Sequence, residues 1–166
     1  MNKPIENEFH TVRGYQLIKQ NESRLTPALE DYLEMTYRLC LEDNYTRINK
    51  LSEMLNVRPS SASKMVSKLI ELDLLKYNNL DNILLTAEGS LTGAYLLERH
   101  NIIESFFSLI GSANALEETE LVEHTLCSFT VFRIKGLLEF LTQNPSVNQE
   151  LKSFMDLSAL SKGECL

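Results

Sequence analysis

The 166-residue sequence has few cysteines and no long hydrophobic run. Cys40, Cys127 and Cys165 are odd in number and widely separated, so they form neither a disulfide framework nor a CxxC motif, and this usage is typical of a reducing cytoplasm. We expect Cys40 and Cys127 in the core. The longest fully apolar runs are a few residues, as at 83–85, whereas a membrane helix needs about 20. The sequence therefore predicts a cytoplasmic protein that does not span a membrane.

The sequence also lacks a secretory signal, internal repeats and low-complexity segments. Its first residues, MNKPIENEFH, include acidic residues and no apolar run. Apolar residues make up 43% and charged residues 23% of the chain, which is ordinary for a globular protein. With about 150 residues as the usual size of a domain, the length predicts one domain or two small units sharing a core.

Basic residues are scarce: 16 stand against 23 acidic residues, for a net charge of −7. Taken alone, this balance argues against a nucleic-acid-binding protein. Residues 45–77, however, carry six basic and only three acidic side chains. This segment could approach a polyanion, while the acidic residues elsewhere keep the protein soluble or bind a cation.

Hydrophobic periodicity predicts a mainly helical chain. Thr26 is expected to cap the first helix, Thr86 a later, longer one, and Asn114 with Glu117 the helix after that. Gly89 in the long helix indicates close packing. The expected elements are helices over 27–42, 46–55 and 60–72, strands over 74–77 and 83–86, and helices over 87–109, 115–127, 129–142 and 147–160.

Residues 48–68 fit a helix-turn-helix that is followed by a hairpin wing. Ser52 is small where the two helices cross, and Asn56 tolerates the left-handed conformation of the turn. Short hydroxyls and lysines on an exposed second helix suit the major groove of DNA, although a three-helix cluster with a serine-rich surface would share the turn pattern. The expected DNA-contacting residues are Arg47, Ser60, Ser61, Ser63, Lys64, Lys68 and Lys76.

Carboxylates and histidines recur at helical spacing. Two acidic residues lie three apart in the first helix, an E-x-x-E-H cluster shares one face of a later helix, and a histidine lies in the long helix. If these faces meet, the like charges repel unless a cation binds; separately, each is more often a solvated face. The donors are oxygen-rich with two nitrogens and no thiolate, which favours an ion such as Mn²⁺. The candidate ligands are Asp31, Glu34, His100, Glu120, Glu123 and His124.

Over about residues 26–142 the chain resembles the diphtheria toxin repressor family of metalloregulators. The resemblance is carried by LTPALEDYLEMTY, LSEMLNVRPSSASKMVSKL, LLTAEG, LLERH and ETELVEHTL. It implies that the six candidate ligands match the family's ligands and form a two-ion site. Asp31 and Glu120 stand where iron-responsive members have Met and Cys, so the resemblance favours the manganese branch.

Together these features predict a mainly α fold in three parts. An N-terminal extension of unknown structure covers 1–24, a winged helix-turn-helix DNA-binding domain covers 25–92, and an all-helical dimerisation and metal-binding domain covers 93–166. The helix over 129–142 is apolar on nearly every side, which predicts a subunit interface.

The function predicted from the sequence is a manganese-activated repressor of metal uptake genes, not an enzyme. It would bind a palindromic operator in double-stranded DNA as a homodimer, with two Mn²⁺ per protomer and no small-molecule substrate. One alternative is an iron(II)-dependent repressor of the same family, and another is a metal-independent helix-turn-helix regulator. A metal-dependent hydrolase with Glu123 as base is disfavoured because no further nucleophile or phosphate loop is found.

Overall fold

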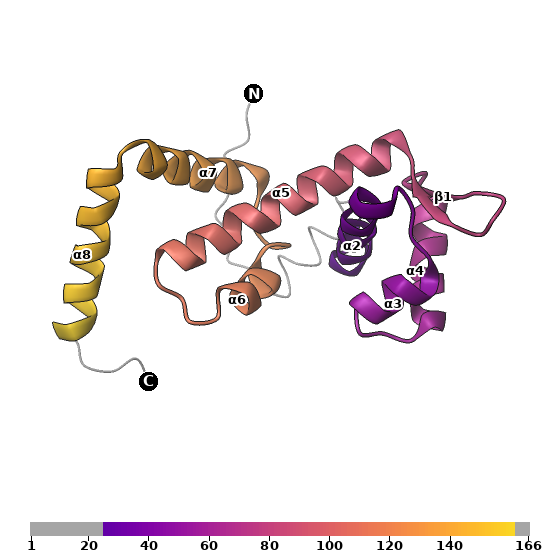
Figure 1. The fold of residues 1–166 in the computed structure, drawn as a ribbon, viewed down its shortest axis with the longest axis horizontal. Helices are drawn as coiled ribbons and strands as arrows, with labels where there is room; N and C mark the ends of the chain where they lie inside the picture. The colour runs from indigo at the N-terminus through magenta and orange to yellow at the C-terminus, as the bar shows by residue number, and fades with distance from the viewer. Residues whose placement is uncertain (1–24, 162–166) are drawn as a thin grey trace, which may run out of the picture. The chain divides into compact units, whose positions relative to one another are not determined.

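A computed structural model describes the backbone of residues 25–161 and the side chains of residues 25–156 (Figure 1). The expected N-terminal extension and Cys165 lie outside these described residues. The chain divides into two compact units, one ending at Gly93 and the other beginning at Ala94. No helix among the described residues is long and apolar enough to cross a membrane.

The described part of the chain is mainly helical and contains one two-stranded antiparallel sheet, which confirms the predicted fold class. Its elements are α2 (Pro27–Asp43), α3 (Ile48–Met54), α4 (Pro59–Glu71), β1 (Leu75–Tyr77), β2 (Ile83–Leu85), α5 (Ala87–Leu109), α6 (Ala115–Val122), α7 (Ser128–Gln143) and α8 (Pro145–Ser161).

The first unit forms where the local signals of the sequence predict it. The Thr26 side chain accepts a hydrogen bond from the backbone N–H of Leu29 at the start of α2. Asn56 adopts a left-handed conformation (φ 51°) between α3 and α4, and the buried Ser52 leaves room between those helices. Helices α2, α3 and α4 pack on one another and on the hairpin. The buried core consists of Leu33, Leu51, Ala62, Val66, Leu69, Leu75 and Ile83.

The hairpin is joined closely to the start of α5. Thr86 caps α5, because its Oγ1 accepts a hydrogen bond from the backbone N–H of Gly89 over 2.9 Å. A Cβ placed on Gly89 would lie 1.8 Å from the carbonyl oxygen of Leu74. Only glycine fits at this position, which confirms the close packing expected from the sequence.

Two expectations for the second unit were wrong in detail. Helix α6 ends at Val122 rather than near residue 127, because the backbone turns at Thr125, whose N–H bonds to the carbonyl oxygen of Val122. Asn114 makes no capping hydrogen bond, since its backbone (φ −129°, ψ 49°) departs from the extended conformation of a capping residue. Ser112 takes part instead: its Oγ donates to Glu118 and accepts from the N–H of Asn114.

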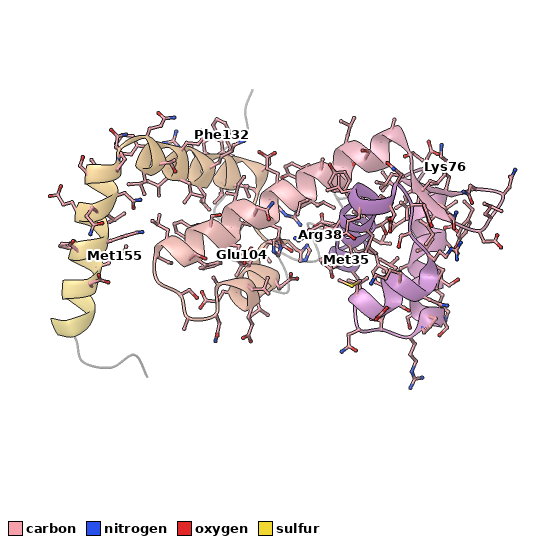
Figure 2. All side chains as sticks on the ribbon, in the orientation of Figure 1. Met35, Arg38, Lys76, Glu104, Phe132 and Met155 are labelled. Atoms are coloured by element: carbon pink, nitrogen blue, oxygen red, sulfur yellow. The ribbon has the colours of Figure 1, made fainter. Side chains whose placement is uncertain are left out.

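Helix α7 exposes much of its apolar surface within the single chain. Val131 and Leu141 are buried, but Phe129 and Phe132 keep 69% and 66% of their surface exposed, and Phe132 is labelled in Figure 2. Leu137 and Phe140 are exposed as well, although α7 packs on α8. An apolar face of this kind is typical of a surface that a partner covers.

The two described cysteines differ in burial. Cys40 is buried, as expected, and burial raises the pKa of its thiol to about 11. The backbone hydrogen bond at Leu85 opposes part of this shift. Cys127 is exposed, with its Sγ 3.2 Å from Oγ1 of Thr130, so the expectation that it lies in the core was wrong. It directly precedes α7, where the backbone is extended rather than helical.

Candidate metal centre and DNA-binding surface

The first group of candidate ligands lies on α2. Asp31 and Glu34 are three residues apart and therefore share a face of this helix. Glu34 is 7% exposed, and Asp31 is partly buried. Arg38, labelled in Figure 2, donates to Oε1 of Glu34 from Nε (3.0 Å) and from Nη2 (2.6 Å). The guanidinium thereby stabilises the charged form of the Glu34 carboxylate in its buried setting.

The second group of candidate ligands comes together in the second unit. His100 of α5 is 4% exposed, and its Nδ1 lies 3.2 Å from Oε2 of Glu123 and 3.7 Å from Oε1 of Glu120. The Nε2 atom of His124 lies 3.6 Å from Oε1 of Glu123. On the other side of the His100 ring, Nε2 is 3.7 Å from a carboxylate oxygen of Glu104. The carboxylate of Glu123 thus lies between two imidazole rings.

Glu123 is the residue of this group whose burial calls for a cation. It is 1% exposed, and its Oε2 makes no hydrogen bond within the part of the chain that the structure describes. A buried carboxylate is costly unless it is paired or coordinates a metal. The surrounding donors are carboxylate oxygens and imidazole nitrogens, which suit a divalent metal ion. These residues therefore fit a metal site in their chemistry.

The structure thus brings together four of the six expected ligands within the second unit, while the other two belong to the first unit. Sequence reasoning missed one member of the second group. Nη2 of Arg99, which is buried, lies 3.2 Å from Nδ1 of His124. These two residues are 25 positions apart, and no sequence pattern connects them. The contact orients the His124 ring so that its other nitrogen, Nε2, is the one nearer Glu123.

The expected DNA-binding side chains gather in the first unit. Ser60, Ser61 and Lys64 are exposed on α4. Lys68 follows one turn later and is exposed, whereas Ser63 is only partly exposed. The surface combines short hydroxyls with positive charge, as a DNA-binding helix requires. Arg58, which directly precedes α4 and is exposed, belongs to the same surface although the sequence analysis did not select it.

Arg47 and Lys76 complete this surface at the hairpin. Lys76 is exposed on β1, and Figure 2 shows it at the hairpin. Arg47 directly precedes α3, and its Nε donates to Oδ1 of Asn82 over 2.9 Å. The hairpin of β1 and β2 follows α3 and α4 in the order of a winged helix-turn-helix.

Comparison with known proteins matches both units to one family. Residues 24–80 match the iron dependent repressor N-terminal DNA binding domain, and residues 86–152 match the iron dependent repressor metal binding and dimerisation domain. The HTH-type transcriptional regulator MntR of Listeria welshimeri is 37% identical over 130 residues, which are 77% of this chain and 92% of that protein. MntR of Shouchella clausii is 36% identical over 129 residues, 76% of this chain and 90% of that protein.

A solved structure agrees with this assignment. The manganese regulator SloR is 30% identical, with a TM-score of 0.60 over 70% of this chain. The match covers 55% of SloR, so the chain spans about half the length of that protein. The chain belongs to the iron dependent repressor family, also known as the diphtheria toxin repressor family, and is a metal-dependent, DNA-binding transcriptional repressor.

Proposed function

We propose that this repressor is activated by manganese and controls genes for metal uptake. The observation that carries the proposal is the buried Glu123 carboxylate between His100 and His124. Its setting offers oxygen and nitrogen donors without a thiolate, which suits Mn²⁺. The names of the relatives support the same ion, because MntR regulators and the manganese regulator SloR are among them.

We assign six ligands to the metal: Asp31, Glu34, His100, Glu120, Glu123 and His124. The four carboxylates carry four negative charges, which two divalent ions would balance, and this supports two Mn²⁺ per protomer. When bound, the metal supplies a positive charge that makes the buried carboxylates favourable. Because two of the ligands belong to the first unit and four to the second, metal binding would couple the DNA-binding unit to the dimerisation unit.

Iron(II) is the competing activator. Mn²⁺ and Fe²⁺ are neighbours in the Irving–Williams order, so the same oxygen and nitrogen donors separate them weakly. Glu120 offers a hard oxygen donor at an exposed position of the site. A thiolate there would favour softer ions, so the carboxylate of Glu120 supports manganese over more thiophilic metals.

On the DNA side, we propose that α4 is the recognition helix of a homodimer on a palindromic operator. Its exposed serines and lysines would contact base edges and phosphates, and Arg47 and Lys76 would contact the backbone near the hairpin. The half-sites of such dimers lie about 34–36 Å apart, so only some spacings between the two α4 helices fit the operator. Metal would favour those spacings, and by linkage DNA would raise metal affinity by the same factor.

The proposal is tested by a Mn²⁺ titration of metal-free protein in which electron paramagnetic resonance reports the free ion. We expect saturation near two ions per chain, and Glu123→Gln should remove most of this binding. Glu117→Gln is a matched control, because Glu117 is an exposed acidic residue of α6 outside the site. Equal binding by the wild type and Glu123→Gln would overturn the ligand assignment, and saturation with Fe²⁺ alone would favour the iron alternative.

A further inference from the structure

Arg47 is fixed where the hairpin meets the helix-turn-helix. The contact between its Nε and Oδ1 of Asn82 spans 2.9 Å and links residues 35 positions apart. The neighbouring residues are paired through their backbones: Thr46 N–H donates to the Ile83 carbonyl over 3.0 Å, and Ile83 N–H donates to the Thr46 carbonyl over 2.8 Å. This double hydrogen bond sets the distance between the Arg47 and Asn82 backbones, so the side-chain contact does not depend on a flexible loop.

Asn82 is itself held in place by the hairpin turn. Its backbone carbonyl accepts from the N–H of Asn78, and its own N–H donates to Oδ1 of Asn78, each over 3.0 Å. Asn82 is 6% exposed, so few other rotamers are open to it. Its Oδ1 is therefore a preorganised acceptor. A buried asparagine at the end of a hairpin turn has no evident role in the core, which is formed by apolar side chains.

The geometry leaves Arg47 suited to bind an anion. Asn82 engages Nε, so the two terminal amino groups are the donors that can form a paired contact with phosphate oxygens. The Cζ atom of Arg47 also lies 5.9 Å from the centre of the Tyr45 ring, which limits the guanidinium further. Arg47 is exposed despite these contacts. Fixing a long side chain before binding reduces the entropy that binding would otherwise cost.

The charges around the hairpin indicate which anion this is. Lys76 is the basic residue of the hairpin and Asp81 its acidic one, so the hairpin alone has little net charge. Arg47 adds a second positive charge beside Lys76, on the unit that carries the exposed serines and lysines of α4. A DNA phosphate next to the groove occupied by α4 would meet both charges.

We propose that Asn82 is a positioning residue that holds Arg47 as a contact to the DNA backbone. This inference rests on the proposed DNA binding and adds a residue that does not itself touch DNA. Because the contact is to phosphate, its contribution is independent of base sequence and decreases with salt. The Asn82 side chain contributes to DNA binding only through Arg47.

The experiment measures binding of the full chain, loaded with Mn²⁺, to a fluorescent mixed-sequence duplex over a range of salt concentrations. We expect Asn82→Ala to weaken binding about threefold to tenfold, as expected when one long side chain must be immobilised on binding. Arg47→Ala should lose more and lower the salt slope by about 0.9 for each phosphate contact. In the double variant, Asn82→Ala should cost nothing beyond Arg47→Ala. Asn79→Ala is the matched control, because Asn79 is an exposed residue of the same turn.

A second variant keeps the test valid if Asn82→Ala disturbs the hairpin. Arg47→Lys retains the charge but lacks the Nε donor, so it should weaken binding about as much as Asn82→Ala. The inference is overturned if Asn82→Ala leaves affinity unchanged, if it costs the same factor in the Arg47→Ala background, or if Arg47→Lys binds like the wild type. Failure of the wild type to bind any duplex with Mn²⁺ would instead contradict the proposed function.

Discussion

The two units of this repressor differ in how they bury their apolar side chains. In the first unit, Leu33, Leu51 and Ile83 are fully buried among elements of the same chain. In the second unit, α7 keeps Phe129 and Phe132 more than half exposed. The first unit thus completes its core alone, while the second leaves an apolar face for a partner. This difference matches the DNA-binding and dimerisation domains of the family to which they belong.

The charged residues follow a related contrast. In the first unit the basic side chains Lys64, Lys68 and Lys76 are exposed, as contact with a polyanion requires. In the second unit Glu123 and His100 are buried and close to each other. Exposed charges contribute little to stability, whereas a buried carboxylate depends strongly on its partner. The first unit therefore presents charge to a ligand outside the protein, and the second encloses charge that a small cation can balance.

The largest effect on the comparison is expected from Gly89→Ala. The new Cβ would meet the Leu74 carbonyl at 1.8 Å, so the hairpin and α5 must separate and the closed core of the first unit opens. We expect the free energy of unfolding to fall by about 3 kcal/mol or more, measured by chemical denaturation.

Gly136→Ala in α7 is the matched control, because nothing lies within 4 Å of its added Cβ. Removing a glycine from a helix interior should stabilise the protein by about 1 kcal/mol. A loss of stability from Gly136→Ala as large as that from Gly89→Ala would show that the second unit is packed as closely as the first, against the comparison.

A large effect on assembly, rather than on folding, is expected from Phe132→Glu. A charge in the apolar face of α7 should raise the dimer dissociation constant about 30-fold or more, as truncating a central aromatic side chain does. Sedimentation velocity at micromolar concentration measures this change. Leu80→Glu is the control, since Leu80 is an equally exposed apolar residue in the hairpin turn of the first unit. If only Leu80→Glu dissociated the dimer, the partner surface would lie on the wrong unit.

The smallest effect concerns the two described cysteines, one in each unit. Burial raises the pKa of Cys40 to about 11, so at pH 8 roughly one thousandth of this thiol is the reactive thiolate. The fraction rises as the pH approaches the pKa, so Cys40 should react more readily at higher pH. Cys127 is exposed, and we expect it to be alkylated at least about tenfold faster than Cys40. Peptide mass spectrometry after timed iodoacetamide treatment measures both rates, and equal rates would argue against the closed first unit.

Sequence reasoning succeeded where a structure depends on nearby residues. Thr26 and Thr86 cap their helices through residues three positions away, and Asn56 adopts the left-handed conformation of the expected turn. It failed at Asn114, where a serine two residues earlier makes the hydrogen bonds that the capping pattern predicted for Asn114. The same four-residue pattern can therefore be satisfied by different neighbours, and only the backbone conformation distinguishes them.

The candidate site was predictable in part for the same reason. Helical spacing brought Glu120, Glu123 and His124 to one region, and the structure adds His100 to it. The contact between Arg99 and His124 was not predictable, because it joins residues far apart in sequence with no pattern between them. The same holds for Arg47 and Asn82.

The most direct test of metal-dependent repression compares DNA binding by the same protein with and without Mn²⁺. Metal-free protein, prepared with a chelator, is titrated against duplexes from the promoters of metal-uptake genes, with fluorescence anisotropy as the readout. The account predicts that saturating Mn²⁺ raises DNA affinity by at least about fivefold, as expected for a coupling free energy of 1 kcal/mol or more, and that Glu123→Gln loses this gain. Equal affinity with chelator and with Mn²⁺ would contradict the account and leave a metal-independent helix-turn-helix protein.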